Sequence, residues 1–397
     1  MSAYLLDWLA LLGRWAHLVT GIAWIGASFY FVWLDDHLLP PQRKDLVDAG
    51  VGGELWAMHG GGFYNAQKYK LAPAALPEPL HWFYWEAYST WLTGFFLLCL
   101  LYFGQPQVYL IDPAVLPLGA PAAIGIALAF LAGGWLAYDA LCRLLGRNER
   151  ALAIAVGALC CVIAFGLCAI FSGRGAYILF GATLGTMMVA NVFFVIIPGQ
   201  REIVKAKQQG RAPDPVFGTR GKQRSVHNTY FTLPVVFAML SNHYAMTYTN
   251  KFNWVVLVLI MLAGALIRQF FVMRHRGKQL WYLPIGGVAL LSGALVWTMP
   301  KPVAPEAQAA NAPKIAINDI MPILQQRCVE CHSAKPTLMG SAPAGVMFDT
   351  PDEVSKNAQR IYEQAVRLKA MPIGNVTHMT DDERVKLAAW FEGGAVK

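Results

Sequence analysis

Residues 151–171 read ALAIAVGALCCVIAFGLCAIF, an apolar stretch without a single charged side chain. A helix needs about 20 such residues to cross the ~30 Å hydrocarbon core of a bilayer. The rest of the chain agrees, because 56% of its 397 residues are hydrophobic and only 14% are charged, whereas soluble proteins carry about 25% charged residues. The composition excludes a soluble globular enzyme and a disordered protein, and it predicts a protein that crosses a membrane several times.

Seven further apolar windows bring the expected number of spans to eight. They lie near residues 8–33, 82–103, 121–142, 176–197, 231–249, 252–273 and 281–299. The first contains Arg14 and His17 and has no small-residue cleavage site after a short apolar core, so it is expected to remain as a helix and not to be removed as a signal peptide. The predicted fold is all-α, an eight-span transmembrane helical bundle followed by a small soluble domain.

Basic residues are distributed unequally between the two sides of this bundle. The loops after the first, third, fifth and seventh spans hold 17 Lys and Arg residues, and the other side holds only Arg174 and Lys251. Basic loops stay in the cytoplasm, so both chain ends are expected outside it. The net charge of +8 arises before Lys301, where it accompanies membrane topology, and no nucleic-acid partner is expected.

The chain changes character after the eighth span. Residues 1–299 form the expected membrane domain, and residues 300–313 (PKPVAPEAQAANAP) are typical of a semi-rigid linker. Residues 314–397 form a small domain with helices expected at 315–327, 351–369 and 380–392. The last of these begins with a capping box, Thr380 and Glu383.

The small domain contains Cys328-Val329-Glu330-Cys331-His332, the C-x-x-C-H pattern of haem c attachment. Thiols one helical turn apart can bond the two vinyl groups of one porphyrin, and the adjacent His332 then reaches the iron from the same face. A zinc or redox site is the alternative use of the two cysteines. The predicted location outside the cytoplasm, where cytochromes c are matured, favours haem c.

A second axial ligand of haem c is expected about forty residues after the motif. Met371 precedes Pro372, which would hold it in an extended turn after the middle helix, where a His/Met cytochrome c presents its methionine. Met379 and Met347 are the alternative ligands, and any of these methionines can also be core filler.

Two histidines inside the spans are candidate ligands of a haem b. His17 and His243 both fall in the outer half of the bilayer. Gly13 and Gly21, four residues before and after His17, leave a flat groove of the kind that a porphyrin along the helix needs. The alternative is a hydrogen bond from each histidine to a neighbouring helix.

Further polar residues lie toward the cytoplasmic side. His81 and His227 are expected at similar depth and are candidate ligands of a second haem b, with solvated loop histidines as the alternative. Glu86, Asp139 and Arg268 lie within spans, where ionisable groups are costly, so they are candidates for interhelical pairs, proton routes or substrate contacts.

The loop after the first span is too long for a simple connection and contains the run 59–64, HGGGFY. Three consecutive glycines allow backbone amides to approach a ligand closely, and Phe63 and Tyr64 can stack on a planar ring. An interfacial turn with aromatic anchors at the headgroup level is the alternative.

These motifs together resemble the bacterial membrane-bound urate hydroxylase family. The resemblance covers essentially the whole chain and is carried by Trp15-Ala16-His17 with Gly21, Trp24 and Gly26, by residues 59–64, by 82–86 (WFYWE), by 191–200 (NVFFVIIPGQ), by 224–230 (RSVHNTY) and by the C-terminal C-x-x-C-H domain. It implies oxidation of urate to 5-hydroxyisourate in the bacterial inner membrane, with electrons passed to haem c on the periplasmic side and no hydrogen peroxide formed. An external cytochrome c or a terminal oxidase is the implied electron acceptor.

The chemistry of urate narrows the choice of site residues. A planar purine anion needs an aromatic platform, donors for its carbonyls and a base for its N–H. The expected catalytic residues are His59 and Glu86, and the expected binding residues are Phe63, Tyr64 and Asn228, converging near the cytoplasmic mouth. The alternative functions are a redox-linked membrane transporter or sensor, and a quinol-oxidising electron-transfer protein with a fused cytochrome c.

Overall fold

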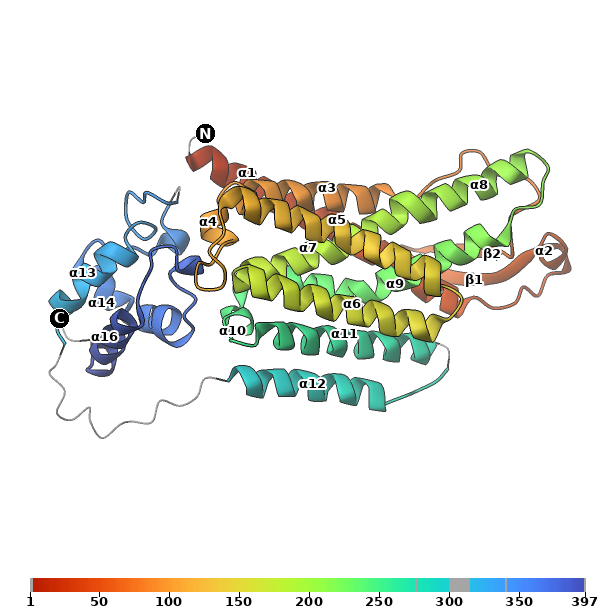
Figure 1. Cartoon of the computed structure of the whole chain (residues 1–397). Coiled ribbons are helices and arrows are strands. Elements are labelled where there is room, and N and C mark those ends of the chain that lie inside the picture. Colours follow the sequence, from red (N-terminus) through yellow and green to blue (C-terminus); the bar gives the residue numbers. More distant parts are fainter. Residues whose placement is uncertain (1–2, 276, 300–314, 340, 396–397) are drawn as a thin grey trace.

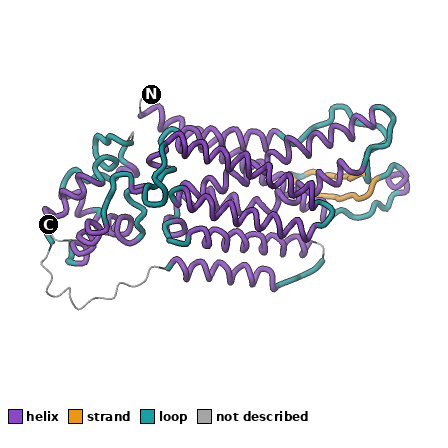
Figure 2. The backbone as a smooth tube through the Cα atoms, viewed as in Figure 1, coloured by secondary structure: helices purple, strands orange, loops and turns teal. Residues whose placement is uncertain are grey.

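The computed structural model describes residues 3–275, 277–299, 315–339 and 341–395. Long helices lie side by side in a bundle, a smaller helical part lies against one end of it, and a β-hairpin projects from the other end (Figures 1 and 2). We call the end with the β-hairpin the hairpin end. We call the opposite end, where the smaller helical part lies, the α4 end, after the short helix α4 (Pro106–Tyr109) found there. The predicted linker, residues 300–313, lies outside the described residues.

Six helical segments are long and apolar enough to cross a membrane. They are α1 (Ala3–His37), α3 (Trp85–Leu97) with the π-helical turn η1 (Leu98–Phe103), α5 (Ala120–Leu145), α6 (Glu149–Ile170), α7 (Gly173–Asn191) continuing through the π-helical turn η2 (Val192–Ile196) into α8 (Ile197–Gln208), and α11 (Asn253–His275). The outer surface of the bundle carries large apolar side chains such as Leu18, Ile154 and Val162, each more than 60% exposed. Both observations are compatible with a membrane protein and match six of the eight predicted spans.

The other two predicted spans are helical but differ from the prediction. The helix α9 begins at Pro215, well before the span predicted at 231–249, and ends at Leu240. A 3₁₀ turn, η3 (Ser241–His243), and the short helix α10 (Ala245–Tyr248) follow it. The helix α12 (Tyr282–Thr298) is apolar but short, with 17 residues.

The first long loop contains strands, so the prediction of an all-α fold is wrong there. After the short helix α2 (Lys44–Asp48), β1 (Val51–His59) pairs antiparallel with β2 (Gly62–Tyr69), with His59 opposite Gly62. Gly60 and Gly61, with φ of 58° and 80°, make the two-residue turn. A turn with φ > 0 at both central residues matches the twist of hairpin strands, so these glycines serve the turn.

The helix α7 is the centre of the bundle. Fourteen of its 19 residues are buried, and α5, α6 and α9 pack around it. Glycines allow this close approach: a Cβ at Gly134 would lie 2.6 Å from Thr183 Cγ2, and a Cβ at Gly181 would lie 2.7 Å from Ala238 Cβ. Small residues at such contacts let helix backbones pack closely in a membrane.

The C-terminal part has its own hydrophobic core, which includes Ile320, Leu324, Val354 and Trp390. Its helices are α13 (Ile317–Arg327), α14 (Pro351–Lys356), α15 (Ala358–Ile361) with the π-helical turn η5 (Tyr362–Arg367), and α16 (Asp381–Glu392). The three predicted helices are confirmed, the middle one with a break at Asn357. The predicted capping box is also present, since Glu383 N donates to Thr380 Oγ1 at 3.2 Å and Thr380 N donates to Glu383 Oε2 at 2.7 Å.

The C-terminal part touches the bundle at the α4 end. Gly374 has a left-handed backbone (φ 58°), and a Cβ there would lie 2.9 Å from the carbonyl oxygen of Ile111, just after α4. Ser341 Oγ donates to Asp7 Oδ2 at 3.4 Å in a second contact. The turn η6 (Ile373–Asn375) therefore packs directly on α4.

We predict that Gly181→Leu lowers the thermal stability of the bundle, because the new side chain would overlap Ala238 on α9. Overpacking of this kind costs about 1–3 kcal/mol. Gly185→Leu is the matched control, since it lies one turn further along α7 and a Cβ there meets nothing within 4 Å. Thermal unfolding followed by tryptophan fluorescence compares the two variants, and an equal effect of both would contradict the predicted α7–α9 contact.

Candidate functional site

Six polar side chains from three helices meet inside the bundle toward the hairpin end. They are Tyr138 and Asp139 of α5, Asn191 of α7, and Arg224, His227 and Asn228 of α9. All except the half-buried His227 are at most 7% exposed. We call these six residues the buried polar cluster. Buried polar groups require partners, and the hydrogen bonds within the cluster supply them.

The charged members of the cluster form an ion pair. Arg224 Nη2 donates to Asp139 Oδ1 at 2.5 Å, and Arg143, on the exposed side, donates to Asp139 Oδ2 at 2.6 Å. The Arg224 guanidinium also lies over the Tyr138 ring, 4.9 Å from its centroid. Removing one partner of a buried pair would leave an uncompensated charge, so the pair ties α9 to α5.

Asn191 connects the ion pair to the neutral members. Its Oδ1 accepts from Arg224 Nη1 at 3.1 Å, and its Nδ2 donates to Asn228 Oδ1 at 2.9 Å and to Tyr138 Oη at 3.1 Å. Tyr138 Oη lies 2.7 Å from His227 Nδ1. Because Tyr138 Oη accepts from Asn191, its proton is available to His227 Nδ1. A continuous hydrogen-bonded chain thus joins an imidazole to a buried carboxylate. The Tyr138 hydroxyl and the His227 imidazole can share a proton, whereas Asn191 and Arg224 form hydrogen bonds without transferring a proton and fix the positions of their partners.

The sequence predicts only part of this cluster. It points to Asn228 and His227 as site residues and to Asp139 as a polar residue in a span, but it assigns no role to Tyr138, Asn191 and Arg224. The spacing of Arg224, His227 and Asn228 does indicate a shared polar face on one helix, because residues i, i+3 and i+4 lie on the same side of a helix.

The other expected urate residues lie apart from the cluster. His59 is exposed at the hairpin turn, and Phe63 and Tyr64 are 76% and 58% exposed on β2. Glu86 is half-buried in the first turn of α3. Of the five residues expected to converge, Asn228 is the one that the structure places among the buried polar side chains.

His17 hydrogen-bonds to a neighbouring helix, which was the alternative to haem ligation. Its Nδ1 lies 3.0 Å from the carbonyl oxygen of Thr90 and 3.1 Å from Thr93 Oγ1, both on α3. A carbonyl only accepts, so Nδ1 carries the proton and Nε2 is the nitrogen that can bind iron. The groove expected at Gly13 is filled, however, since a Cβ there would lie 2.9 Å from Leu97 Cδ2 and 3.0 Å from Phe96 Cε1.

The remaining histidines proposed for haem b lie on different parts of the fold. His243 is exposed in η3 after α9, and His81 is exposed in the segment before α3. His227 belongs to the buried polar cluster. Ligation of haem b by these histidines therefore stays a prediction.

The haem c motif has a geometry that suits attachment. The motif follows α13 as a turn, with the Cys331 and His332 backbone amides donating to the carbonyl of Cys328 at 3.1 and 2.8 Å. His332 Nδ1 donates to the Val346 carbonyl at 2.9 Å, which leaves Nε2 for the iron. Burial lowers the pKa of His332 and raises the pKa of the Cys328 thiol to about 12. The imidazole is therefore neutral, the form that binds iron.

Met371 borders the same core as the motif, and its backbone is fixed. Its carbonyl accepts a hydrogen bond of 2.8 Å from Arg384 Nη1, which also donates to the carbonyl of Ala365. Met379 is 4% exposed, and its backbone is bonded on both sides by Asn375. The two thiols and the free Nε2 of His332 are of the types that haem c requires, and Met371 stays the predicted second ligand.

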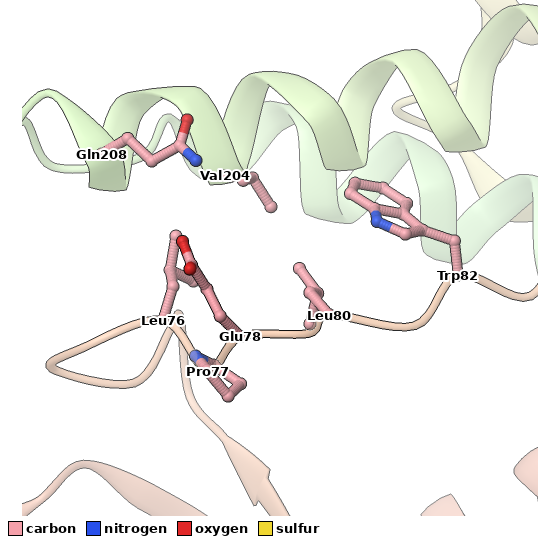
Figure 3. Close-up of a pocket in the computed structure, with 7 residues that line it drawn as sticks. All are labelled: Leu76, Pro77, Glu78, Leu80, Trp82, Val204 and Gln208. Carbon is pink, nitrogen blue, oxygen red and sulfur yellow. The ribbon is translucent and has the colours of Figure 1, made fainter.

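A groove of about 270 Å³ lies at the hairpin end between the segment 76–82 and α8 (Figure 3). It is lined by Leu76, Pro77, Glu78, Leu80, Trp82, Val204 and Gln208. Trp82 offers an aromatic ring and Gln208 an amide, but no basic side chain lines it among the described residues. The groove therefore lacks a positive charge to hold a purine anion.

Comparison with known proteins gives one match. The family model described as urate oxidase N-terminal matches residues 3–299 of the chain. No curated protein and no solved structure matches. The match spans the whole bundle, including the buried polar cluster, and ends before the C-terminal part.

We predict that Arg224→Gln destabilises the bundle by about 1–3 kcal/mol, because it leaves the buried Asp139 carboxylate with the exposed Arg143 as its cation and without the buried one. The double variant Arg224→Gln/Asp139→Asn removes both charges and is expected to recover much of the loss. Thermal unfolding of the two variants measures this. A double variant no more stable than the single one would show that the pair is not coupled.

We also predict that Met371→Ala keeps covalently attached haem c but loses the methionine ligand, which opens the iron to added imidazole. Absorption spectra with and without imidazole detect the change. Met379→Ala is the matched control and is expected to keep the spectrum of the parent. An unchanged spectrum in Met371→Ala would make Met379 or Met347 the ligand.

Proposed function

Because the chain belongs to the urate oxidase N-terminal family, we propose that it oxidises urate to 5-hydroxyisourate at a bacterial inner membrane and passes the electrons to haem c in its own C-terminal domain. The observation that carries the proposal is the family match over residues 3–299. We assign residues 1–299 to urate oxidation and residues 314–397 to a cytochrome c domain.

The reaction balances without oxygen as a reactant. Urate and water give 5-hydroxyisourate, two protons and two electrons, and water adds at C5 of the oxidised purine. Haem c, when bound to Cys328, Cys331 and His332, supplies one-electron transfer. The two electrons leave one after the other to an external cytochrome c or a terminal oxidase, and no hydrogen peroxide is formed.

The protein's own residues bind the substrate and handle its protons in this proposal. His227 and Tyr138 hold a proton between them at 2.7 Å, and the Asp139–Arg224 pair sets the charge beside them. His59 and Glu86 remain proposed catalytic residues, and Phe63, Tyr64 and Asn228 remain proposed binding residues, at the same end of the bundle.

In this proposal the two activities belong to opposite ends of the molecule. The hairpin end carries the basic loops and is proposed to face the cytoplasm, whereas the C-terminal domain lies against the α4 end (Figure 1). Electrons must then cross most of the ~30 Å apolar core. This distance is the reason for proposing haem b as an intermediate carrier.

We predict that the purified full-length protein oxidises urate without oxygen and reduces two molecules of added cytochrome c per urate. The Cys328→Ala/Cys331→Ala variant is expected to lose this coupling, because its haem c cannot attach. Spectrophotometry at the urate and cytochrome bands measures both rates, and a peroxide assay in air accompanies them. Stoichiometric peroxide would contradict the proposal.

The same preparation decides between the alternatives. A pyridine haemochrome assay separates extractable haem b from covalent haem c, and at least one haem b per haem c is expected. Urate that accumulates unchanged in sealed vesicles would indicate a transporter. Reduction of the haem by quinol with urate inert would indicate a quinol-oxidising protein.

A further inference from the structure

Arg268 is a buried cation whose hydrogen-bonding capacity is only partly used. It lies on α11 and is 8% exposed, and its Nε and Nη2 have no hydrogen-bond partner among the described residues. Burying a charge in an apolar bundle is costly unless the charge is paired and hydrogen-bonded. An arginine kept in this state indicates a partner that comes from outside the chain.

The other buried arginines of the described structure are satisfied. Arg224 donates to the carboxylate of Asp139 and the amide oxygen of Asn191, and Arg384 donates to two backbone carbonyls. The comparison shows that burial of arginine in this protein normally comes with acceptors. Arg268 differs in this respect.

The two unused nitrogens of Arg268 belong to one side of its guanidinium. Nε–H and the adjacent Nη2–H point in parallel and can grip two acceptor atoms of one planar group. Arg43 shows this geometry on the protein surface, where its Nε and Nη2 donate to the two carboxylate oxygens of Asp45 at 3.1 and 2.5 Å. A ligand with two acceptors in one plane would satisfy Arg268 in the same way.

An aromatic ring lies against this guanidinium. Phe29 of α1 has its ring centroid 5.0 Å from Arg268 Cζ. A planar ligand gripped by the fork lies in the guanidinium plane, so its ring can extend over the aromatic face as well. The neighbouring Gln269 carries a side-chain amide, whose oxygen accepts a hydrogen bond from the Tyr230 hydroxyl.

The location permits entry from the hairpin end. Arg268 precedes the end of α11 at His275 by seven residues, or roughly 10 Å of helix. The helix α1 packs along α3 and touches α11 and α9 only over short stretches. A Cβ at Gly26, one turn from Phe29, would meet nothing within 4 Å. Polar side chains mark the outer rim between the two helices, where His275 Nδ1 lies 3.7 Å from Asp36 Oδ2.

We propose that Arg268 and Phe29 form the binding site of the urate anion, which enters between α1 and α11. This inference rests on the proposed function and places its substrate. Coplanar oxygen and nitrogen acceptors on the rim of the purine suit the fork, and the anion supplies the acceptors that Nε and Nη2 of Arg268 lack. In this placement Arg268 and Phe29 replace Phe63, Tyr64 and Asn228 as the residues that hold the anion, and neither belongs to the buried polar cluster or lines the groove beside Trp82.

The test measures urate binding to the full-length protein in nanodiscs, reduced and without an electron acceptor so that no turnover occurs. Arg268→Gln is expected to raise the Kd of urate about 10- to 100-fold, the value of a lost charge-assisted hydrogen-bonded contact. Phe29→Leu is expected to raise it about 2- to 10-fold through loss of the aromatic face. Arg274→Gln, which removes an exposed arginine from the same helix, is the matched control and is expected to stay within about 2-fold of the parent.

A second set of measurements tests whether the site recognises the negative charge of urate. It also includes a variant that keeps the buried charge, in case Arg268→Gln does not fold. Hypoxanthine, a neutral purine near pH 7, is expected to bind the parent more weakly than urate, and Arg268→Gln is expected to lose this preference. Arg268→Lys keeps the buried charge without the fork, so it is expected to fold and to bind urate at least about 5-fold more weakly than the parent.

The outcomes separate this placement from the proposed function. A parent protein that oxidises urate while Arg268→Gln and Arg268→Lys bind urate as tightly as the parent overturns the placement alone. Loss of extractable haem b in these variants with unchanged urate affinity would show that the anion is a haem propionate, and it also overturns the placement. A parent that neither binds nor oxidises urate refutes the proposed function itself.

Discussion

The cost of keeping a charge inside an apolar bundle is the constraint on which the rest of this structure depends. The first half of α9 is too polar to face lipid, and its charged Arg224 is buried inside the bundle, with 5% of its surface exposed. Its burial is possible because Asp139 and Asn191 present acceptors from α5 and α7. These contacts require α5, α7 and α9 to meet side by side, so the ion pair determines which helices surround α7 and places His227 and Asn228 inside the bundle.

The same constraint explains why two sites of different character lie toward one end. In the buried polar cluster the chain supplies a partner for every charge, which suits a lasting structural role. At Arg268 the chain leaves Nε and Nη2 without a hydrogen-bond partner among the described residues, which suits the proposed site for an exchangeable ligand. A fully satisfied arginine would gain little by binding an anion, because the anion would have to displace an existing acceptor. In this protein, a buried arginine without acceptors for all its N–H groups is therefore a better indicator of a binding site than a buried polar side chain as such.

The sequence predicted those features that depend on local pattern. Apolar length predicted eight spans, six of which match helices long and apolar enough to cross a membrane, and the capping box at Thr380 and Glu383 predicted the start of the last helix. The hairpin was missed because residues 60–61 were interpreted as a ligand-binding loop, although two glycines between extended segments also indicate a hairpin turn. The contacts of Arg224 and Arg268 could not be predicted, since helical periodicity gives the face of a residue but not the helix that this face meets. For His17 the local glycines suggested a haem groove, whereas packing against α3 filled it.

The contact between the C-terminal part and the bundle bears on the proposed transfer of electrons between them. Electron transfer slows steeply with distance, so a cytochrome domain on a linker would exchange electrons slowly unless it also docked. Gly374 follows the proposed ligand Met371 by three residues and lies against the carbonyl of Ile111. Gly374 adopts a left-handed backbone, which is costly for other residues. Because it also has no side chain, the turn can pack closely against the bundle. A segment that carries the proposed iron ligand is therefore also one that touches the bundle, so in the proposed function haem c lies close to the contact between the two parts of the chain.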